Sequence, residues 1–260
     1  MKSFLLLAIL STVICVSVPA SATTFHVDGS VLSSGDGTSW ETAFKKIQEG
    51  IDKAFDGDTV LVAEGTYREN VNFKGKNIVL TGTNPLRQTV VENTVIDGNH
   101  TGPVVSFAGT EREDCVLAGF TIRNGKAEYG GGIYGGPNDS CTLATISNNI
   151  IRENSAESHG GGLAHCAGTI VNNTIILNSA GGAVAGRGAG VYCCDGVIEN
   201  NLISRNSGAG DGGGLYGCRG IIQNNTIVNN SADWGAVVRN RASVRVAGRG
   251  TMATSEIEGC

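Results

Sequence analysis

Apolar residues recur along the second half of the chain in a phrase that repeats about every 24 residues. In each copy, one isoleucine stands two positions before a pair of asparagines, and a second isoleucine stands two positions after it. The pairs begin at residues 148, 172, 200 and 224, with spacings of 172−148 = 24, 200−172 = 28 and 224−200 = 24. A fixed period of this length is typical of a solenoid, in which each copy forms one coil.

Glycine clusters alternate with the isoleucine and asparagine phrases. They lie at 160–162, 188–190 and 212–214, where the second has alanine in its middle, and each begins 12 residues before the next asparagine pair. The distance from a pair to the following cluster is 12, 16 and 12 residues, so the middle unit has four extra residues, within Ala180 to Arg187. The regular units are therefore scaffold, and this insertion is the place where the period breaks.

A unit of this length, with three short apolar strands and polar corners, predicts an all-β fold in which each unit is one coil of a parallel β-helix. Equivalent positions would stack ~4.8 Å apart, with isoleucine on isoleucine inside. Asparagine side chains can hydrogen-bond to their neighbours at a corner and tolerate a left-handed backbone, and glycine allows the tighter bends. We therefore expect the asparagines to be structural.

The first part of the chain predicts short strands and one helix. Thr38 and Glu41 have the spacing of a capping box, and apolar residues at helical spacing follow from Trp40 to Ala54. An open β-helix end exposes apolar side chains and strand edges, so we expect this helix to be the amino-terminal cap, with no further helix after it. The expected strands are Phe25–Val27, Thr59–Ala63, Tyr67–Phe73, Asn77–Thr81, Val90–Asp97 and Val104–Phe107.

Two stretches of the chain resemble right-handed parallel β-helix proteins of the pectin-lyase-like superfamily. The segment from Phe25 to Thr83, with its Asp36-Gly37-Thr38-Ser39-Trp40 and Glu64-Gly65-Thr66-Tyr67 motifs, is similar to the cap and first coils of that superfamily. The segment from Cys115 to Trp234 resembles its general repeat. The superfamily includes polysaccharide lyases, glycoside hydrolases and noncatalytic surface proteins, so the resemblance implies a fold more firmly than a function.

The amino terminus has the pattern of a cleaved secretory signal. Lys2 precedes an apolar run from Phe4 to Val18, and Ala20-Ser21-Ala22 matches a small-residue cleavage site. The run is too short to favour a retained membrane anchor, and no later segment is apolar enough to cross a bilayer. We expect a signal peptide at 1–22, a cap with first coils at 23–114, regular repeats at 115–235 and an atypical arginine-rich tail at 236–260, in a secreted or cell-surface protein.

Net charge and cysteine spacing exclude some partners. A formal net charge of −5 without a block of Lys or Arg argues against nucleic acid. Cys166, Cys194 and Cys218 each stand four residues before the first isoleucine of a phrase, so they should stack in a row. A row does not converge on a tetrahedral centre, which leaves inert thiols or a disulfide between neighbouring coils rather than zinc.

Stacking of the coils should place two sets of candidate functional side chains in rows. The positions directly before the glycine clusters hold Tyr129, His159, Arg187 and Asp211, and the positions four residues into the clusters hold Tyr134, Tyr192 and Tyr216. The resemblance to lyases implies a calcium site with an acid and a base. In that interpretation His159, Arg187 and Asp211 are catalytic, Asp211 is a calcium ligand, and the tyrosines bind sugar rings. The alternative is that both rows are solvated turn and wall residues.

Three functions remain open at this point. The first is a secreted β-helix that binds carbohydrate or another cell-surface polymer on its exposed wall. The second is a polysaccharide lyase or glycoside hydrolase acting on acidic polysaccharide. The third is a fragment of a bacterial surface adhesin, because the repeat stops after Trp234-Gly235, where a shifted reading frame is one explanation.

Overall fold

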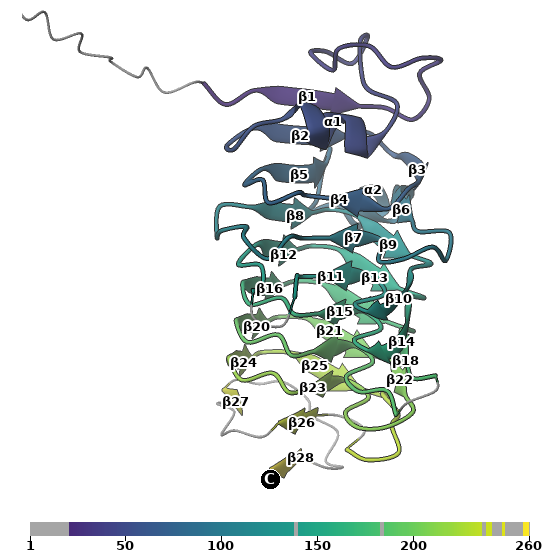
Figure 1. The fold of residues 1–260 in the computed structure, drawn as a ribbon, viewed down its shortest axis with the longest axis vertical. Helices are drawn as coiled ribbons and strands as arrows, with labels where there is room; N and C mark the ends of the chain where they lie inside the picture. Colours follow the sequence, from purple (N-terminus) through teal and green to yellow (C-terminus); the bar gives the residue numbers. More distant parts are fainter. Residues whose placement is uncertain are drawn as a thin grey trace, which may run out of the picture.

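The computed structural model describes residues 21–137, 140–182 and 185–235, and beyond them only the backbone of three short strands. The chain winds into a right-handed parallel β-helix whose coils stack along one axis (Figure 1). Three sheets, which we call A, B and C, run along the stack, and a shorter sheet D forms a fourth side in the middle coils. The predicted fold class is confirmed, and the fourth side is an addition to the three strands expected for each coil.

The strands of each sheet follow one another along the axis. Sheet A contains β1 (Thr24–Val27), β2 (Thr59–Val62), β5 (Val79–Gly82), β8 (Val116–Ala118), β12 (Thr145–Ser147), β16 (Thr169–Val171), β20 (Val197–Glu199), β24 (Ile221–Gln223) and β27 (Val246–Ala247). Sheet B contains β3 (Gly65–Arg68), β6 (Thr94–Asp97), β9 (Thr121–Arg123), β13 (Ile150–Arg152), β17 (Thr174–Ile176), β21 (Leu202–Ser204) and β25 (Thr226–Val228). Sheet C contains β4 (Val71–Asn72), β7 (Val105–Ser106), β11 (Ile133–Tyr134), β15 (Leu163–Ala164), β19 (Val191–Tyr192), β23 (Leu215–Tyr216), β26 (Val238–Asn240) and β28 (Ile257–Gly259). Sheet D contains β10 (Lys126–Tyr129), β14 (Ser155–His159), β18 (Ser179–Ala180) and β22 (Ser207–Gly208).

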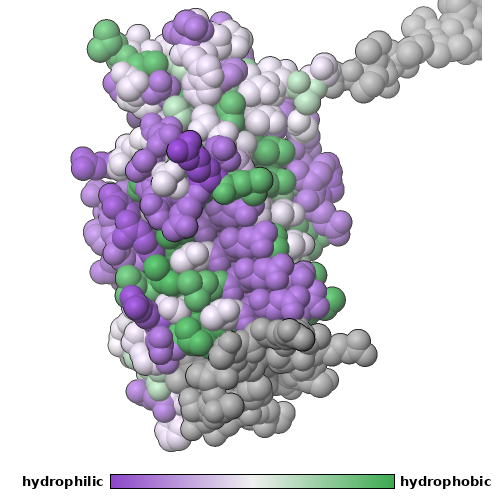
Figure 2. All heavy atoms as spheres, turned by 180° about the vertical axis from the view of Figure 1, so that it is seen from behind, coloured by the Kyte–Doolittle hydropathy of each residue, from purple (hydrophilic) through white to green (hydrophobic). Residues whose placement is uncertain are grey.

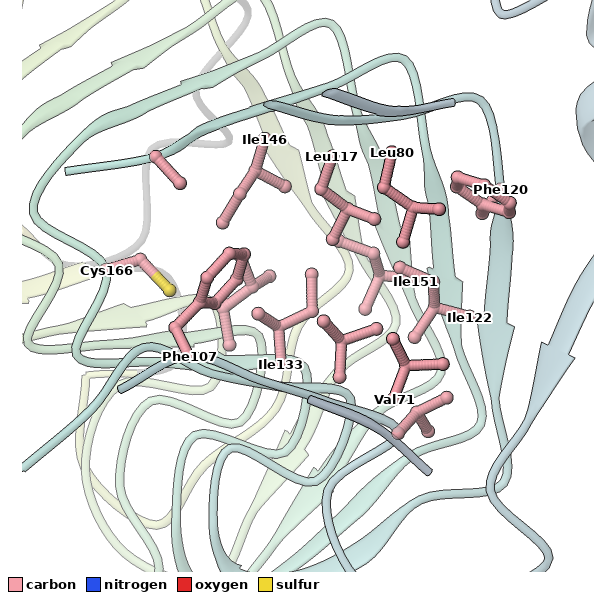
Figure 3. Close-up of a cluster of buried hydrophobic side chains, with 14 of the residues drawn as sticks. Val71, Leu80, Phe107, Leu117, Phe120, Ile122, Ile133, Ile146, Ile151 and Cys166 are labelled. Atoms are coloured by element: carbon pink, nitrogen blue, oxygen red, sulfur yellow. The ribbon is translucent and has the colours of Figure 1, made fainter. Parts of the chain in front are cut away.

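The isoleucines stack in register, as the repeat predicts. Ile146, Ile170, Ile198 and Ile222 are paired along sheet A, and the second isoleucines of the phrases are paired along sheet B. They belong to one continuous apolar core that extends from Phe25 to Ile227. Figure 3 shows side chains from the surrounding sheets pointing into this core. Each strand therefore gains stability from the coils on either side rather than from its own length.

Two ladders of buried asparagine amides support the corners. One ladder contains the second asparagine of each pair, at 149, 173, 201 and 225. Each side-chain amide donates to a backbone carbonyl of the preceding coil, and each side-chain oxygen also accepts from a backbone N–H of that coil. Asn154, Asn178, Asn206 and Asn230 form a similar ladder at the next corner. The first residues of the pairs have φ near +55°, which asparagine tolerates. The structural interpretation of the asparagines is thus confirmed.

Two helix predictions are wrong, namely the start of the first helix and the expectation that no other helix follows it. Helix α1 spans Ile47–Lys53, so the expected start at Thr38 and Trp40 is wrong. The Thr38 hydroxyl and N–H instead donate to Asp36 in a surface turn, and these bonds, together with one from Thr42, lower the pKa of Asp36 to about 2. A second helix, α2 (Gln88–Asn93), occupies part of the expected strand 90–97, because burial of Val90 and Val91 outweighs their β propensity.

Helix α1 is held by residues that are distant in sequence. The carboxylate of Glu69 accepts hydrogen bonds from the N–H groups of Ile47 and Gln48, at 2.9 and 3.1 Å. The Gln48 amide pairs with both the N–H and the carbonyl of Asn72 in β4, the terminal strand of sheet C. On the edge that does not pair with β2, the backbone of β1 forms hydrogen bonds with the loop at 37–44. These contacts cover strand edges, although the role of α1 as a cap stays a prediction.

Replacing Lys76 with methionine should loosen α1. The Lys76 ammonium donates to the carbonyls of Ile51, Asp52 and Ala54 at 2.7, 2.9 and 2.7 Å, which satisfies the carboxyl end of the helix. We expect a loss of about 2 kcal/mol in the free energy of unfolding, measured by urea denaturation. Lys74→Met is the control, because Lys74 makes only an exposed ion pair with Asp52, which should contribute less than ~1 kcal/mol. Equal losses in both variants would contradict this account.

Cysteines stack in the core as expected. Cys166, Cys194 and Cys218 are buried, and the Cys166 N–H lies 3.3 Å from the sulfur of Cys194. Burial raises the pKa of Cys194 and Cys218. Cys166, Cys194 and Cys218 are free thiols. Of the two expected alternatives, the structure therefore has the inert thiols.

The surface is mostly hydrophilic, with separate apolar patches, on the face seen in Figure 2. None of the helices in the described part of the chain is long and apolar enough to cross a membrane.

The predicted signal at 1–22 lies almost entirely outside the described residues. In the predicted tail, β26 pairs with β23 and β27 pairs with β24, so sheets C and A continue past residue 235.

Candidate functional site

The residues before the glycine clusters form one row at the corner between sheets D and C. Tyr129 and His159 end β10 and β14 and are paired, and His159 pairs in turn with Arg187. The N–H of Gly188 donates to the carbonyl of Asp211 at 3.0 Å, and Asp211 pairs with Trp234. The structure thus brings His159, Arg187 and Asp211 together in adjacent coils, as predicted. Each residue of the row is followed by a glycine with positive φ. At Gly160, for example, a Cβ would lie 2.6 Å from the Leu163 carbonyl oxygen, so only glycine fits the turn.

The tyrosines form a second row on sheet C, next to the first. Each follows an inward-facing Ile, Val or Leu in its strand, so the alternation of strand side chains places the ring outward. The rings of Tyr192 and Tyr216 are stacked with centroids 5.8 Å apart and planes 5° apart. Between Tyr134 and Tyr192 the register position is Ala164, so the predicted row is interrupted there.

Two histidines lie in the interruption at Ala164. The His159 ring stacks on Tyr192 at 4.5 Å, and the His165 ring meets Tyr134 and Tyr192 edge-on at 6.1 and 5.5 Å. Tyr129 also lies edge-on to both histidines. We call Tyr129, Tyr134, His159, His165, Tyr192 and Tyr216 the aromatic wall. It joins side chains from four stacked coils into one continuous surface.

Sequence reasoning missed His165 and Trp234. His165 is only 5% exposed and adopts a φ of +59°, and nothing in the repeat marks its position. Trp234 is 65% exposed and extends the row by one coil. It could have been found, because it stands directly before Gly235 just as Tyr129 stands before Gly130.

The polar members of the row are paired with one another. The Nε of Arg187 donates to Asp211 at 3.2 Å, and its guanidinium carbon lies 5.2 Å from the centre of the Tyr216 ring, within cation–π range. The backbone N–H of Arg187 donates to Nδ1 of His159 at 3.2 Å. This bond requires a lone pair on Nδ1, so the neutral ring has its hydrogen on Nε2 and acts there as a donor.

Burial sets the protonation of the wall. Burial lowers the pKa of His159, as does the charge of Arg187, and together they outweigh the opposite effect of the Ser158 carbonyl. Burial and the nearby His159 also lower the pKa of His165, against the opposite effect of Asp195. Burial raises the pKa of Tyr134 and Tyr192. At neutral pH His159, His165, Tyr134 and Tyr192 are therefore uncharged, and the charged side chains beside them, Arg187 and Asp211, are paired with each other.

Folding stability should fall as the pH drops below about 6.5, the ordinary value for histidine. Because the folded state lowers the pKa of both histidines, the unfolded chain binds protons first, and stability present above pH 6.5 is lost as the pH falls through the folded pKa values. Thermal unfolding between pH 7.5 and 5 measures this, within the range ~5–8 where other groups titrate little. His165→Asn, which tolerates the positive φ, should reduce the slope. An unchanged slope would show that His165 is not responsible.

The donor set at Asp211 does not fit calcium, which the resemblance implied. Calcium takes six to eight oxygen ligands. The Asp211 carboxylate is 15% exposed and ion-paired with Arg187, and among the described residues no group of three or more His, Cys, Asp or Glu side chains could hold a metal. The function proposed below is therefore derived without a calcium ion at Asp211.

Comparisons with known proteins give a similar fold. No family model matches the chain, and no curated protein matches it. Among solved structures, it is similar to a mutant pectin methylesterase in complex with a hexasaccharide, at 13% identity and a TM-score of 0.46, over 85% of this chain and 72% of that one.

Proposed function

We propose that this is a secreted β-helix protein that binds a polysaccharide along the aromatic wall. The observation that supports this most directly is the row of aromatic rings that includes the parallel, stacked pair Tyr192 and Tyr216. Because the Tyr192 ring is stacked between His159 and Tyr216, the row offers the outward edges of its rings to the C–H groups of sugars, and its phenol groups can form hydrogen bonds. Their spacing follows the coil repeat of ~4.8 Å, so a polymer aligned with the axis can contact successive rings.

The polar residues beside the rings support binding. The Nε2–H of His159 is a donor suited to a sugar hydroxyl. The Arg187 guanidinium, which lies over the Tyr216 ring, and its partner Asp211 add charged donors and acceptors. Few, precisely placed polar groups on an apolar surface are typical of sites that orient a small ligand or polymer unit.

The pairing of these residues disfavours catalysis. For His159 to accept a proton at Nε2, its hydrogen would have to move to Nδ1, which would remove the hydrogen bond from Arg187. Glycoside hydrolysis needs two carboxyl groups facing one bond, and the row holds Asp211 alone, already paired with Arg187. Binding therefore requires no rearrangement of these residues. Acid–base chemistry requires a change of tautomer at His159 and the loss of the ion pair between Arg187 and Asp211.

Affinity electrophoresis tests the proposal. Gels containing β-glucan, xylan, mannan, polygalacturonate or alginate should retard the wild-type protein in at least one case, and a Tyr192→Ala/Tyr216→Ala variant should lose the retardation. The variant's circular dichroism must stay that of the wild type for the comparison to hold. Absence of retardation in every gel would overturn the proposal.

A lyase or hydrolase acting on acidic polysaccharide is the second candidate, because His159, Arg187 and Asp211 do lie in adjacent coils. Incubation with polygalacturonate, with and without added calcium, decides between the two. Release of unsaturated or reducing ends that disappears in His159→Gln would favour the enzyme. A third outcome, no binding and no turnover together with a gene that continues in another frame, would favour a fragment of a surface adhesin.

A further inference from the structure

A hollow of about 750 Å³ lies on the outer side of sheet D, beside the aromatic wall. Its floor contains small residues, Ser155 in β14 and the pair Gly181 and Gly182. Lys126, Glu128, Glu157 and the ring of Tyr129 also line it. Tyr129 belongs to both the hollow and the aromatic wall, so the two surfaces meet at this residue. A volume of this size is typical of ligand pockets.

The position of the hollow determines what could enter it. The aromatic wall runs along the helix axis, because its residues come from successive stacked coils. The hollow instead lies to one side of that line, around the corner formed by Tyr129 and the following glycine. A chain lying on the wall continues past the hollow, and only a group that leaves the direction of the chain can fill it.

The charged residues around the hollow further restrict which chemical group could enter it. The hollow is lined by one cation and two carboxylates, and Lys126 lies 3.8 Å from Glu157 in an exposed ion pair. The adjoining row adds no net charge, because Arg187 is paired with Asp211 and His159 is neutral at pH 7. A uronic acid would therefore meet a surplus of carboxylate in the hollow. Neutral hydroxyl groups, in contrast, can donate to Glu128 or Glu157 and accept from Lys126.

We infer that the hollow is a second subsite, which receives a neutral glycosyl substituent of a polysaccharide chain lying on the aromatic wall. This inference rests on the proposed function and specifies its ligand as a substituted, neutral polysaccharide. Tyr129 stacks against the substituent at the corner, and Lys126, Glu128 and Glu157 hydrogen-bond to its hydroxyl groups.

The chain offers a matched pair of variants. Ser155 and Ser207 occupy the same register position on the outer side of sheet D, in β14 and β22, but only Ser155 lines the hollow. Ser155 is half-buried and Ser207 is exposed, and tryptophan suits the half-buried surface of a strand. Ser155→Trp should therefore obstruct the hollow without touching Tyr192 or Tyr216, and Ser207→Trp controls for the added ring.

The experiment compares polysaccharides that share a backbone, namely mannan with galactomannan and xylan with arabinoxylan, by affinity electrophoresis and calorimetry. The wild-type protein should bind the substituted member of one pair about ten-fold more tightly, a difference of 1.4 kcal/mol. Ser155→Trp should abolish this preference and leave the affinity for the plain backbone unchanged, and Ser207→Trp should keep it.

Two results would overturn the inference while the proposed function stands. One is a wild-type protein that binds some polysaccharide without preferring a substituted neutral one. The other is a preference that survives Ser155→Trp. Failure of the wild-type protein to bind any of the neutral or acidic polymers would instead overturn the proposed function, and the subsite with it.

Discussion

Replacing Asn173 with alanine is expected to lower the free energy of unfolding by about 3 kcal/mol or more. Asn173 is 1% exposed, and its side-chain oxygen accepts from the N–H and the amide of Asn149 at 2.9 and 3.2 Å. Its own amide donates to the Ile146 carbonyl at 2.8 Å and to Asn201 at 3.1 Å. Alanine leaves several of these buried groups without partners, and each costs ~1–3 kcal/mol.

The matched control for Asn173→Ala is the neighbouring residue of the same pair. Asn172 is exposed and has a φ of +56°, so Asn172→Gly keeps the backbone geometry and should change stability by less than ~0.5 kcal/mol. Chemical denaturation followed by circular dichroism measures both variants. A loss below ~1 kcal/mol in Asn173→Ala would mean that water or a neighbouring amide replaces the missing bonds, and that the ladder is not essential to the fold.

Local periodicity was enough to predict the repeated coils. Once Ile146 and Ile170 are recognised as equivalent, parallel stacking fixes their register, and the same step places Tyr192 beside Tyr216. The helices show where this reasoning ends. Helix α1 begins at Ile47 because Glu69, 22 residues later, accepts its first N–H groups, and a local capping pattern cannot reveal such a partner.

The candidate site was predictable as rows of residues but not as a network. The sequence places His159, Arg187 and Asp211 at one repeat position, and their adjacency follows from that. It does not show that Arg187 donates to both neighbours, or that Ala164 leaves space for His165 between two tyrosines. These contacts depend on which side-chain conformations fit around the corner. They are also the contacts that favour binding over catalysis.

Replacing Tyr192 with alanine should weaken binding of the best-retained polysaccharide by about thirty-fold, which corresponds to roughly 2 kcal/mol. Tyr192 is the centre of the aromatic wall, since its ring contacts His159, His165 and Tyr216. Removing it therefore takes away part of the apolar contact surface and also the support that orients the neighbouring rings. Isothermal titration calorimetry with oligosaccharides of the same polymer measures the change.

Two further variants separate the contribution of the Tyr192 ring from other effects of its substitution. Tyr192→Phe keeps the ring, so if contact with the ring dominates, its affinity should stay within about three-fold of the wild type, a difference below ~0.7 kcal/mol. Trp40→Ala removes an aromatic residue that is 38% exposed in a loop away from the wall, and it should leave the affinity unchanged. A loss in Tyr192→Phe as large as that in Tyr192→Ala would assign the binding energy to the hydroxyl group. A loss in Trp40→Ala would place the polysaccharide at the amino-terminal end of the β-helix, and the aromatic wall would then not be its site.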